Sequence, residues 1–314
     1  MIRSWLIAFA VLAPVANGSL RAADLTAEKV ADGVTIKVGD QLFCRYLTRS
    51  GAKPVVWPIL GPTGKPMTRS YPMENVAGED QDHVHQRSLW FTHGNIDGID
   101  FWSELPGHGT TEHREFLKVE GGPQAVVKTR NDWLGPDGKL HCRDVRTLVF
   151  RADCDTRSID FQIELQAADQ PVTFKDTKEG SFGLRMAAGL TGKSRAGVPL
   201  GGHIVNSHGD TEEHTWGKRA EWVDYYGTIE GEQLGIAVLN HPSSFRYPTY
   251  WHVRPYGLFA ANPFGVHDFS GAGDGTLTLE PGKSLSLRYQ VLLHRGNHES
   301  AKVAEAFEKY ASED

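Results

Sequence analysis

Cysteine is scarce in this 314-residue chain, which contains only Cys44, Cys142 and Cys154. An odd number of cysteines cannot pair completely within one chain. Cys142 and Cys154 flank one predicted strand, which would hold them roughly 40 Å apart at ~3.3 Å per residue. We therefore expect no disulfide between these two, and the sequence favours buried thiols that pack as small apolar groups.

Several motifs with a known chemistry are also missing. The sequence has no Walker loop, no Gly-x-Ser-x-Gly, no Gly-x-Gly-x-x-Gly that opens a helix, and no His-Glu-x-x-His. Cysteine pairs typical of a zinc ribbon are absent as well. The chain carries a net charge of -6 and a sequence pI of about 6.2, and it has no basic stripe. We therefore expect no nucleic-acid partner.

The N-terminal segment has the pattern of a secretory signal peptide. Arg3 is followed by an apolar run from Trp5 to about Val15 and then by small residues. We expect a signal peptide over residues 1–22, and a periplasmic or secreted protein. No later segment is a candidate for crossing a membrane, so we expect no membrane association. A single β-sandwich domain over residues 24–314 is the simplest interpretation of the rest.

Alternation of apolar and polar residues with a period of two dominates the remaining sequence. It predicts a hairpin around Gly39-Asp40, a long hairpin over residues 140–168, and further strands over 233–242, 256–264 and 275–296. Only residues 299–311 have a helical pattern. We predict an all-β fold, a large two-sheet antiparallel sandwich of the supersandwich kind with a short C-terminal helix.

The stretch QDHVHQRSLWFTHGNIDGIDFW, residues 81–102, concentrates polar and aromatic side chains. In a strand, His83, His85 and Arg87 would share one face. Two histidines at this spacing suit one metal or one anionic ligand, although such a pair is more often solvated. Trp90 and its aromatic neighbours offer flat faces on which sugar rings stack, or they fill the core.

Three further segments repeat this mixture of residue types. In DTKEGSFGLRMA, Glu179 is a candidate general acid or base, because partial burial can raise a carboxyl pKa towards neutrality. WVDYYG and HPSSFRYPTYWHVRPYGLFAANPFG follow, and in a strand His252 and Arg254 would again share a face. So many polar side chains are costly to bury without partners, which favours a functional site over a polar core.

Together these four segments resemble a family of exported bacterial proteins that carries the label "methane oxygenase PmoA family". The resemblance implies a carbohydrate role, and it does not assign catalytic residues. The closing strand-turn-strand segment also resembles the last strands of galactose-mutarotase-type supersandwich proteins. Members of the first family often read DHPHHRG where this chain has DHVHQRS, so that Gln86 replaces a histidine. That replacement counts against a metal here.

The favoured hypothesis is an exported enzyme that cleaves, eliminates or epimerises a sugar or keto-sugar by acid and base chemistry. We expect the catalytic residues to line one cavity and to be His83, His85, Arg87, Glu179, His252 and Arg254. We expect the substrate-binding residues to be Trp90, His93, Lys178, Trp222, Asp224, His241, Tyr247, Trp251 and Asn262. Two alternatives stay open: a non-catalytic carbohydrate-binding protein, or a protein that binds a divalent metal through His83, His85 and a third ligand such as His252.

Overall fold

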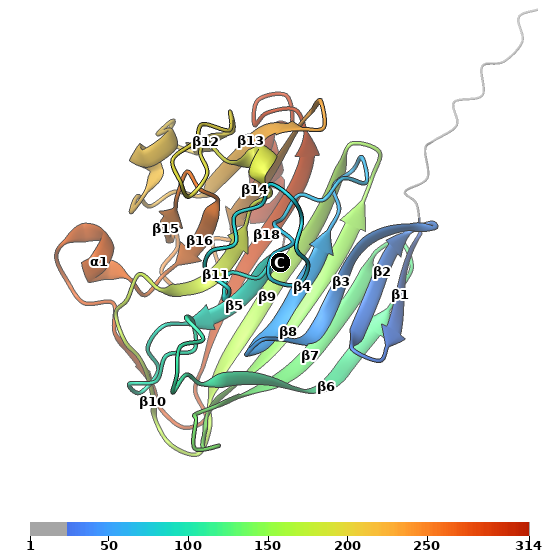
Figure 1. Ribbon diagram of the computed structural model, residues 1–314. Coiled ribbons are helices and arrows are strands. Elements are labelled where there is room, and N and C mark those ends of the chain that lie inside the picture. Colours follow the sequence, from blue (N-terminus) through green and yellow to red (C-terminus); the bar gives the residue numbers. More distant parts are fainter. Residues whose placement is uncertain (1–23, 314) are drawn as a thin grey trace, which may run out of the picture.

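The computed structural model describes residues 24–313, and the predicted signal peptide lies outside the described residues. Two large antiparallel sheets lie face to face (Figure 1). This confirms the predicted two-sheet sandwich. No helix in residues 24–313 is long and apolar enough to cross a bilayer.

The first sheet has eight strands. In spatial order they are β1 (Leu25–Val30), β2 (Gly33–Val38), β3 (Gln41–Ser50), β4 (Lys53–Ile59), β5 (Leu89–His93), β11 (Gly180–Arg185), β16 (Leu258–Asn262) and β15 (Tyr250–Val253). The predicted hairpin around Gly39-Asp40 joins β2 to β3, and it is confirmed. Long segments precede β5 and β11, so the half of this sheet that contains them is assembled from distant parts of the chain.

The second sheet also has eight strands. In spatial order they are β12 (His203–Asn206), β13 (Trp222–Ile229), β14 (Glu232–Asn240), β18 (Ser284–Arg295), β9 (Thr156–Ala167), β8 (Leu140–Ala152), β7 (Ala125–Leu134) and β6 (Thr110–Glu120). The predicted long hairpin is β8 and β9, paired from Cys142 opposite Ala167 to Ala152 opposite Arg157. A small separate sheet pairs β10 (Val172–Phe174) with β17 (Leu277–Leu279), so β17 does not join β18 across the Pro281 turn.

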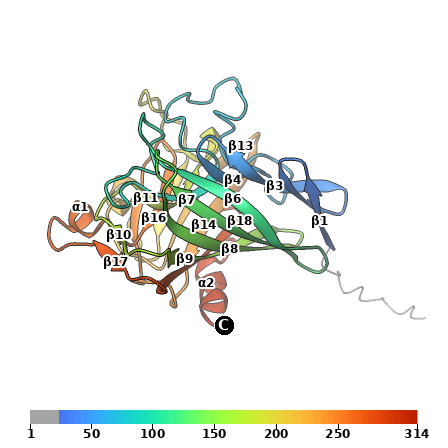
Figure 2. The ribbon, with the colours of Figure 1, turned by 90° about the horizontal axis from the view of Figure 1, so that it is seen from below.

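Helical segments are short. They are α1 (Val266–Ser270), α2 (Val303–Ala311) and two 3-10 turns, Ala188–Leu190 and Glu212–Thr215. The C-terminal helix thus begins four residues later than predicted. It packs its Val303 and Tyr310 against the outer face of the second sheet, beside Trp222 and Leu239. Figure 2 shows α2 on the opposite side of the molecule from the blue-green loops that cover the first sheet.

The main core fills the space between the two sheets, as alternation in the strands requires. On the first sheet, Phe91, Phe182 and Phe259 point into this core. On each of these strands, the residues directly before and after the phenylalanine therefore point to the outer face of the sheet. On that face, His252, Ala260, Gly183 and Trp90 form one row of paired positions across β15, β16, β11 and β5.

The prediction for the cysteines is confirmed in part. All three cysteines are free, so Cys142 and Cys154 are not bonded to each other. Cys44 and Cys142 are buried, but Cys154 is exposed, which corrects the expectation of a buried thiol there. The reason is its position in the short turn between β8 and β9.

Candidate functional site

A cavity of about 370 Å³ lies at the end of the outer face of the first sheet where β15 and β16 meet the loops. Its lining residues are His83, Gln86, Lys178, Glu179, Lys193, Arg195, Glu213, His252, Arg254, Pro255, Tyr256 and Leu258. A larger depression of about 450 Å³ lies beside α2, but none of the predicted site residues lines it. The first cavity is therefore the candidate site.

His252 is positioned by strand β15, in the paired row on the outer face of the sheet. Its side chain is 3% exposed, and its Nδ1 lies 3.0 Å from the Lys178 carbonyl oxygen. A carbonyl only accepts, so Nδ1 carries the proton and donates it. Burial lowers the pKa of His252 to about 4, so the ring is neutral at pH 7. Nε2 then carries a lone pair, and it has no hydrogen-bond partner within residues 24–313.

Glu179 lies just before β11, and the backbone around it is fixed from several sides. The Asn262 amide donates to the Thr177 carbonyl at 2.8 Å, and the Gly94 backbone N–H donates to the Glu179 carbonyl at 2.6 Å. Burial raises the pKa of the Glu179 carboxyl, and the Lys178 ammonium at 3.7 Å only partly opposes this shift. The side chain keeps 41% exposure, and the shift is in the direction that favours the protonated carboxyl, as in groups that exchange a proton with a substrate.

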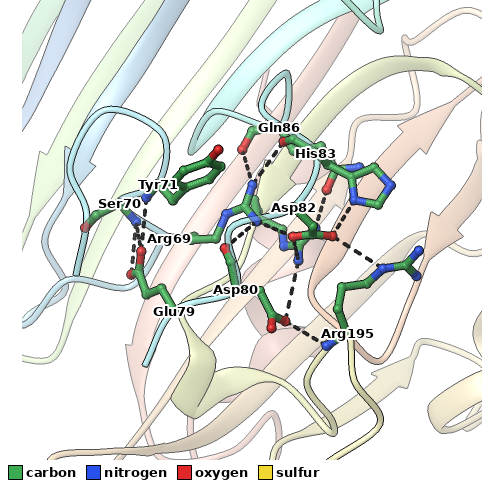
Figure 3. Close-up of polar contacts among 10 residues, drawn as sticks. Arg69, Ser70, Tyr71, Glu79, Asp80, Asp82, His83, Gln86 and Arg195 are labelled. Carbon is green, nitrogen blue, oxygen red and sulfur yellow. Dashed lines mark hydrogen bonds and ion pairs between the residues drawn. The ribbon is translucent and has the colours of Figure 1, made fainter. Parts of the chain in front are cut away.

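Arg69 organises the loop that brings His83 to the cavity (Figure 3). This arginine is 2% exposed, and its two terminal nitrogens donate to three backbone carbonyls, those of Asp80, His83 and Gln86. It also forms an ion pair with Asp82 at 2.5 Å. One buried guanidinium thus replaces the hydrogen bonds that a strand would have supplied to this segment.

Asp82 is the acceptor at the centre of the same network. Arg69, Arg185 and Arg195 pair with its carboxylate, and its second oxygen accepts a short hydrogen bond from His83 Nδ1. Burial alone would raise the Asp82 pKa, but the His83 hydrogen bond and the Arg185 and Arg69 charges hold it well below its usual range. A permanent carboxylate therefore orients His83, as in other carboxylate–histidine pairs.

Residues 83–87 do not form the strand that would place His83, His85 and Arg87 on one face. β5 begins only at Leu89, and His83 and Ser88 adopt positive φ angles of 43° and 54°. The side chains of His83, His85 and Arg87 therefore do not share a strand face. The Arg69 contacts hold this segment as a loop, and the two-residue spacing of the histidines has no structural meaning here.

Two predicted catalytic residues do not line the cavity. Arg87 pairs with Glu104 through two nitrogens, at 3.1 and 2.9 Å, and Lys53 reaches the same carboxylate at 2.5 Å. This buried ion cluster draws Arg87 away from the site. The His85 ring lies between His83, at 5.5 Å between ring centroids, and Trp102, at 6.2 Å. Burial and the Lys53 charge lower the pKa of His85 to about 4.

Of the predicted substrate-binding residues, Lys178 lines the cavity and four others lie close behind it or in the core. Trp90 is 1% exposed, and its indole covers Gly183. Trp251 is in the core and donates from Nε1 to the Ala220 carbonyl. His93 is buried, with Nε2 at 2.9 Å from the Lys175 carbonyl oxygen. Asn262 holds the backbone near Glu179 and does not face the cavity.

The other four belong elsewhere. Asp224, on β13, pairs with His294 of β18 at 2.9 Å, and both side chains are fully buried. Trp222 packs under α2, and His241 contacts the Tyr310 ring of the same helix at 5.0 Å. Tyr247 lies in the loop between β14 and β15, and the cavity does not include it.

Sequence reasoning missed several lining residues. Lys193, Arg195 and Glu213 come from the irregular segment between β11 and β13, which has no periodicity to mark it. Tyr256 could have been identified from the sequence, since it follows Arg254 by two positions in HVRPYG. Its ring stacks on His83 at 5.9 Å and lies under the guanidinium groups of Arg185 and Arg195.

The structure offers no support for the metal alternative. Within residues 24–313, no group of three or more His, Cys, Asp or Glu side chains has the arrangement of a metal site. The rings of His83 and His85 are near each other, but His83 Nδ1 is already hydrogen-bonded to Asp82.

Comparison with protein families matches residues 33–308 to DUF6807, a family of unknown function. This match does not test the resemblance to the PmoA family, which stays a prediction. No curated protein matches the chain.

Among solved structures, a β-arabinopyranosidase is 14% identical, with 81% of this chain and 38% of that chain covered and a TM-score of 0.41. The α-galactosidase AgaA of family GH36 from Geobacillus stearothermophilus is 11% identical, with 88% and 41% covered and a TM-score of 0.43. A galactose mutarotase related enzyme from Lactobacillus acidophilus is 8% identical, with 86% and 97% covered and a TM-score of 0.30. The chain spans about two fifths of the length of the two glycosidases it matches.

Proposed function

This chain belongs to the DUF6807 family, and we propose that it is a carbohydrate-active enzyme that moves a proton on a sugar, in an elimination or an epimerisation. The observation that carries the proposal is that His252 and Glu179 both line one cavity. His252 is held neutral with Nε2 unengaged, and Glu179 has a raised pKa. One is suited to accept a proton and the other to supply one.

His83 supplies a third proton-transfer group in the same cavity. Its Nδ1 is engaged by Asp82, so its other ring nitrogen is the one available to a substrate. A base and an acid on different elements can act on two positions of one ligand, or on two faces of one carbon. This arrangement favours elimination or epimerisation, both of which need a base and an acid.

Hydrolysis fits the cavity less well. Glycosidases generally use two carboxyl groups that flank the bond to be cleaved. Here the second lining carboxylate, Glu213, forms an ion pair with Lys193 at 2.9 Å, and that contact lowers its pKa. The Glu213 carboxylate is 63% exposed and held by Lys193, so it is not directed at a substrate as the base or nucleophile opposite Glu179.

The polar character of the lining supports a sugar as the ligand. Gln86, Lys178 and Glu213 offer donors and acceptors suited to hydroxyl groups, and Tyr256 contributes an aromatic ring. The predicted signal peptide adds export to the proposal. Mass determination of the N-terminus after expression in a Gram-negative host tests this part: cleavage near Ala22 supports export, and an intact N-terminus in the cytoplasm contradicts it.

Exchange of carbon-bound hydrogen tests the reaction. The protein is incubated in D2O with a panel of neutral and acidic monosaccharides and their methyl glycosides, and proton NMR follows loss of C–H signals and the appearance of alkene protons. We expect one or more sugars to react. His252→Asn should abolish the reaction, because the asparagine amide reaches the Lys178 carbonyl but places nothing at Nε2.

The matched control is His203→Asn, a histidine on β12 whose side chain is 55% exposed and which lies outside the cavity. It should leave the rate unchanged. Thermal melting checks that both variants are folded. Binding without exchange or elimination for every sugar of the panel would contradict the proposal and favour a carbohydrate-binding protein.

A further inference from the structure

We infer that the sugar carries a carboxylate group, and that the Arg254 guanidinium binds it. This inference rests on the proposed function, because it names the class of substrate for the same cavity. Its first support is the charge of the lining, where four cationic side chains face two carboxylates. The cations are Lys178, Lys193, Arg195 and Arg254, and the carboxylates are Glu179 and Glu213.

Three of these four cations already have an anionic partner in the protein. Lys178 lies 3.7 Å from Glu179, Lys193 lies 2.9 Å from Glu213, and Arg195 lies 3.4 Å from Asp82. Arg254 has no carboxylate within 4.0 Å in the part of the chain that the structure describes. A cation that is partly removed from water and left without a partner is costly, unless a ligand supplies the missing charge.

The surroundings of Arg254 hold it in place without consuming its hydrogen-bond donors. Its guanidinium lies over the Trp216 ring at 4.9 Å from the centroid, a contact that uses the flat face of the group. Its backbone N–H donates to the Leu258 carbonyl at 2.8 Å, and the Tyr225 hydroxyl donates to its carbonyl oxygen at 3.0 Å. The N–H edge is therefore free for the two-pronged contact that guanidinium groups make with carboxylates.

The position of Arg254 suits the proposed chemistry. It follows His252 by two residues, and both line the cavity. A carboxylate on the sugar makes the hydrogen on the adjacent carbon removable, because the electron pair left behind spreads onto the carboxylate oxygens. Arg254 would stabilise the charge that gathers there, while His252 Nε2 takes the proton.

The subsequent step balances without any further reactant. In elimination, the electron pair of the broken C–H bond forms a C=C bond, the neighbouring C–O bond breaks, and Glu179 gives a proton to the leaving oxygen. The upward direction of the Glu179 pKa shift favours the protonated carboxyl that this step needs. In epimerisation, a proton returns to the same carbon from the opposite side.

Calorimetric titration tests the inference by binding alone. The probes are glucuronate, galacturonate and mannuronate, each compared with glucose, galactose and mannose respectively. We expect at least one uronate to bind about tenfold or more tightly than its neutral counterpart. Arg254→Gln should weaken uronate binding about ten- to hundredfold and leave hexose binding unchanged, because only the charged contact is lost.

The matched control is Arg130→Gln, an arginine on β7 whose side chain is half exposed and paired with Glu115 at 2.9 Å. It should bind uronates like the wild type. Arg254→Lys, which keeps the charge but not the planar fork, should fall between wild type and Arg254→Gln. Melting curves verify the fold of each variant.

The outcomes separate this inference from the proposed function. If no uronate is preferred over its hexose, or if Arg254→Gln weakens hexoses as much as uronates, the carboxylate inference is wrong even where proton exchange on a neutral sugar is seen. If a uronate binds through Arg254 but no sugar exchanges hydrogen, the inference stands and the enzymatic proposal fails.

Discussion

Acidification should destabilise this protein well before its carboxylates are protonated. Three histidines, His85, His93 and His252, have pKa values lowered from 6.5 to about 4, in each case chiefly by burial. In the unfolded chain these rings regain ordinary pKa values and bind protons below pH 6.5. Between pH 6.5 and 4 the unfolded state therefore binds more protons than the folded state, and stability falls as the pH falls.

The size of the effect follows from the two pKa values. A histidine with a pKa of about 4 when folded and 6.5 when unfolded costs about 2 kcal/mol of stability between pH 7 and pH 5. The three histidines together would lower the stability by about 5 kcal/mol. The share of His85 is smaller if water reaches its ring. Groups with raised pKa values, chiefly Glu179 and His294, act in the opposite direction and reduce the net loss.

Urea denaturation at pH 7 and pH 5 measures the effect directly. The wild type should be at least about 2 kcal/mol less stable at pH 5. His252→Asn should lose about 2 kcal/mol less than the wild type over the same interval, whatever its stability at pH 7, because one titrating group is gone. The control His203→Asn should behave like the wild type. Equal stability of the wild type at pH 7 and 5, or an unchanged pH dependence in His252→Asn, would refute the reasoning.

Three further predictions concern single side chains. Arg69→Met should lower the free energy of unfolding by about 2–4 kcal/mol, because it removes the hydrogen-bond partner of three backbone carbonyls and of Asp82. Amide hydrogen exchange should become faster at residues 80–86 but not in β8 or β9. Gly183→Ala should cost about 1–3 kcal/mol by urea denaturation, because a Cβ there would lie 2.6 Å from the buried Trp90 ring. The control is Thr173→Ala, at a half-buried position on β10. A thiol reagent should modify only Cys154 in the native protein and all three cysteines in denaturant, slowly at Cys154 because its hydrogen bond to Asp155 raises its pKa.

The sheets could be predicted from the sequence because alternation is a local signal. Each strand of the β8–β9 hairpin shows its buried face in its own residues, and the turn between them is short. The same rule located His252 and Arg254, since β15 keeps the alternation almost to Arg254. Where the backbone is extended and neighbours in sequence are neighbours in space, spacing alone was sufficient.

Residues 81–88 could not be predicted because their conformation depends on distant partners. Arg69 precedes the loop, and Arg185, which binds Gln86 at 2.5 Å, follows it by almost a hundred residues. No pattern within the loop records either contact. For the same reason Asp224 looked like a site residue: its partner His294 lies 70 residues away, on β18, two strands from β13 in the same sheet.

The two ways of positioning side chains divide the candidate site into parts that should respond differently to mutation. His252 depends on strand pairing, which a change in a single distant side chain leaves intact. His83 depends on Asp82, and Asp82 in turn depends on Arg69 and Arg185. A substitution in this network therefore displaces one proton-transfer group while the other keeps its place. If the reaction needs both, the activity depends on the Asp82 carboxylate, whose arginine partners Arg69, Arg185 and Arg195 lie outside the loop that carries His83.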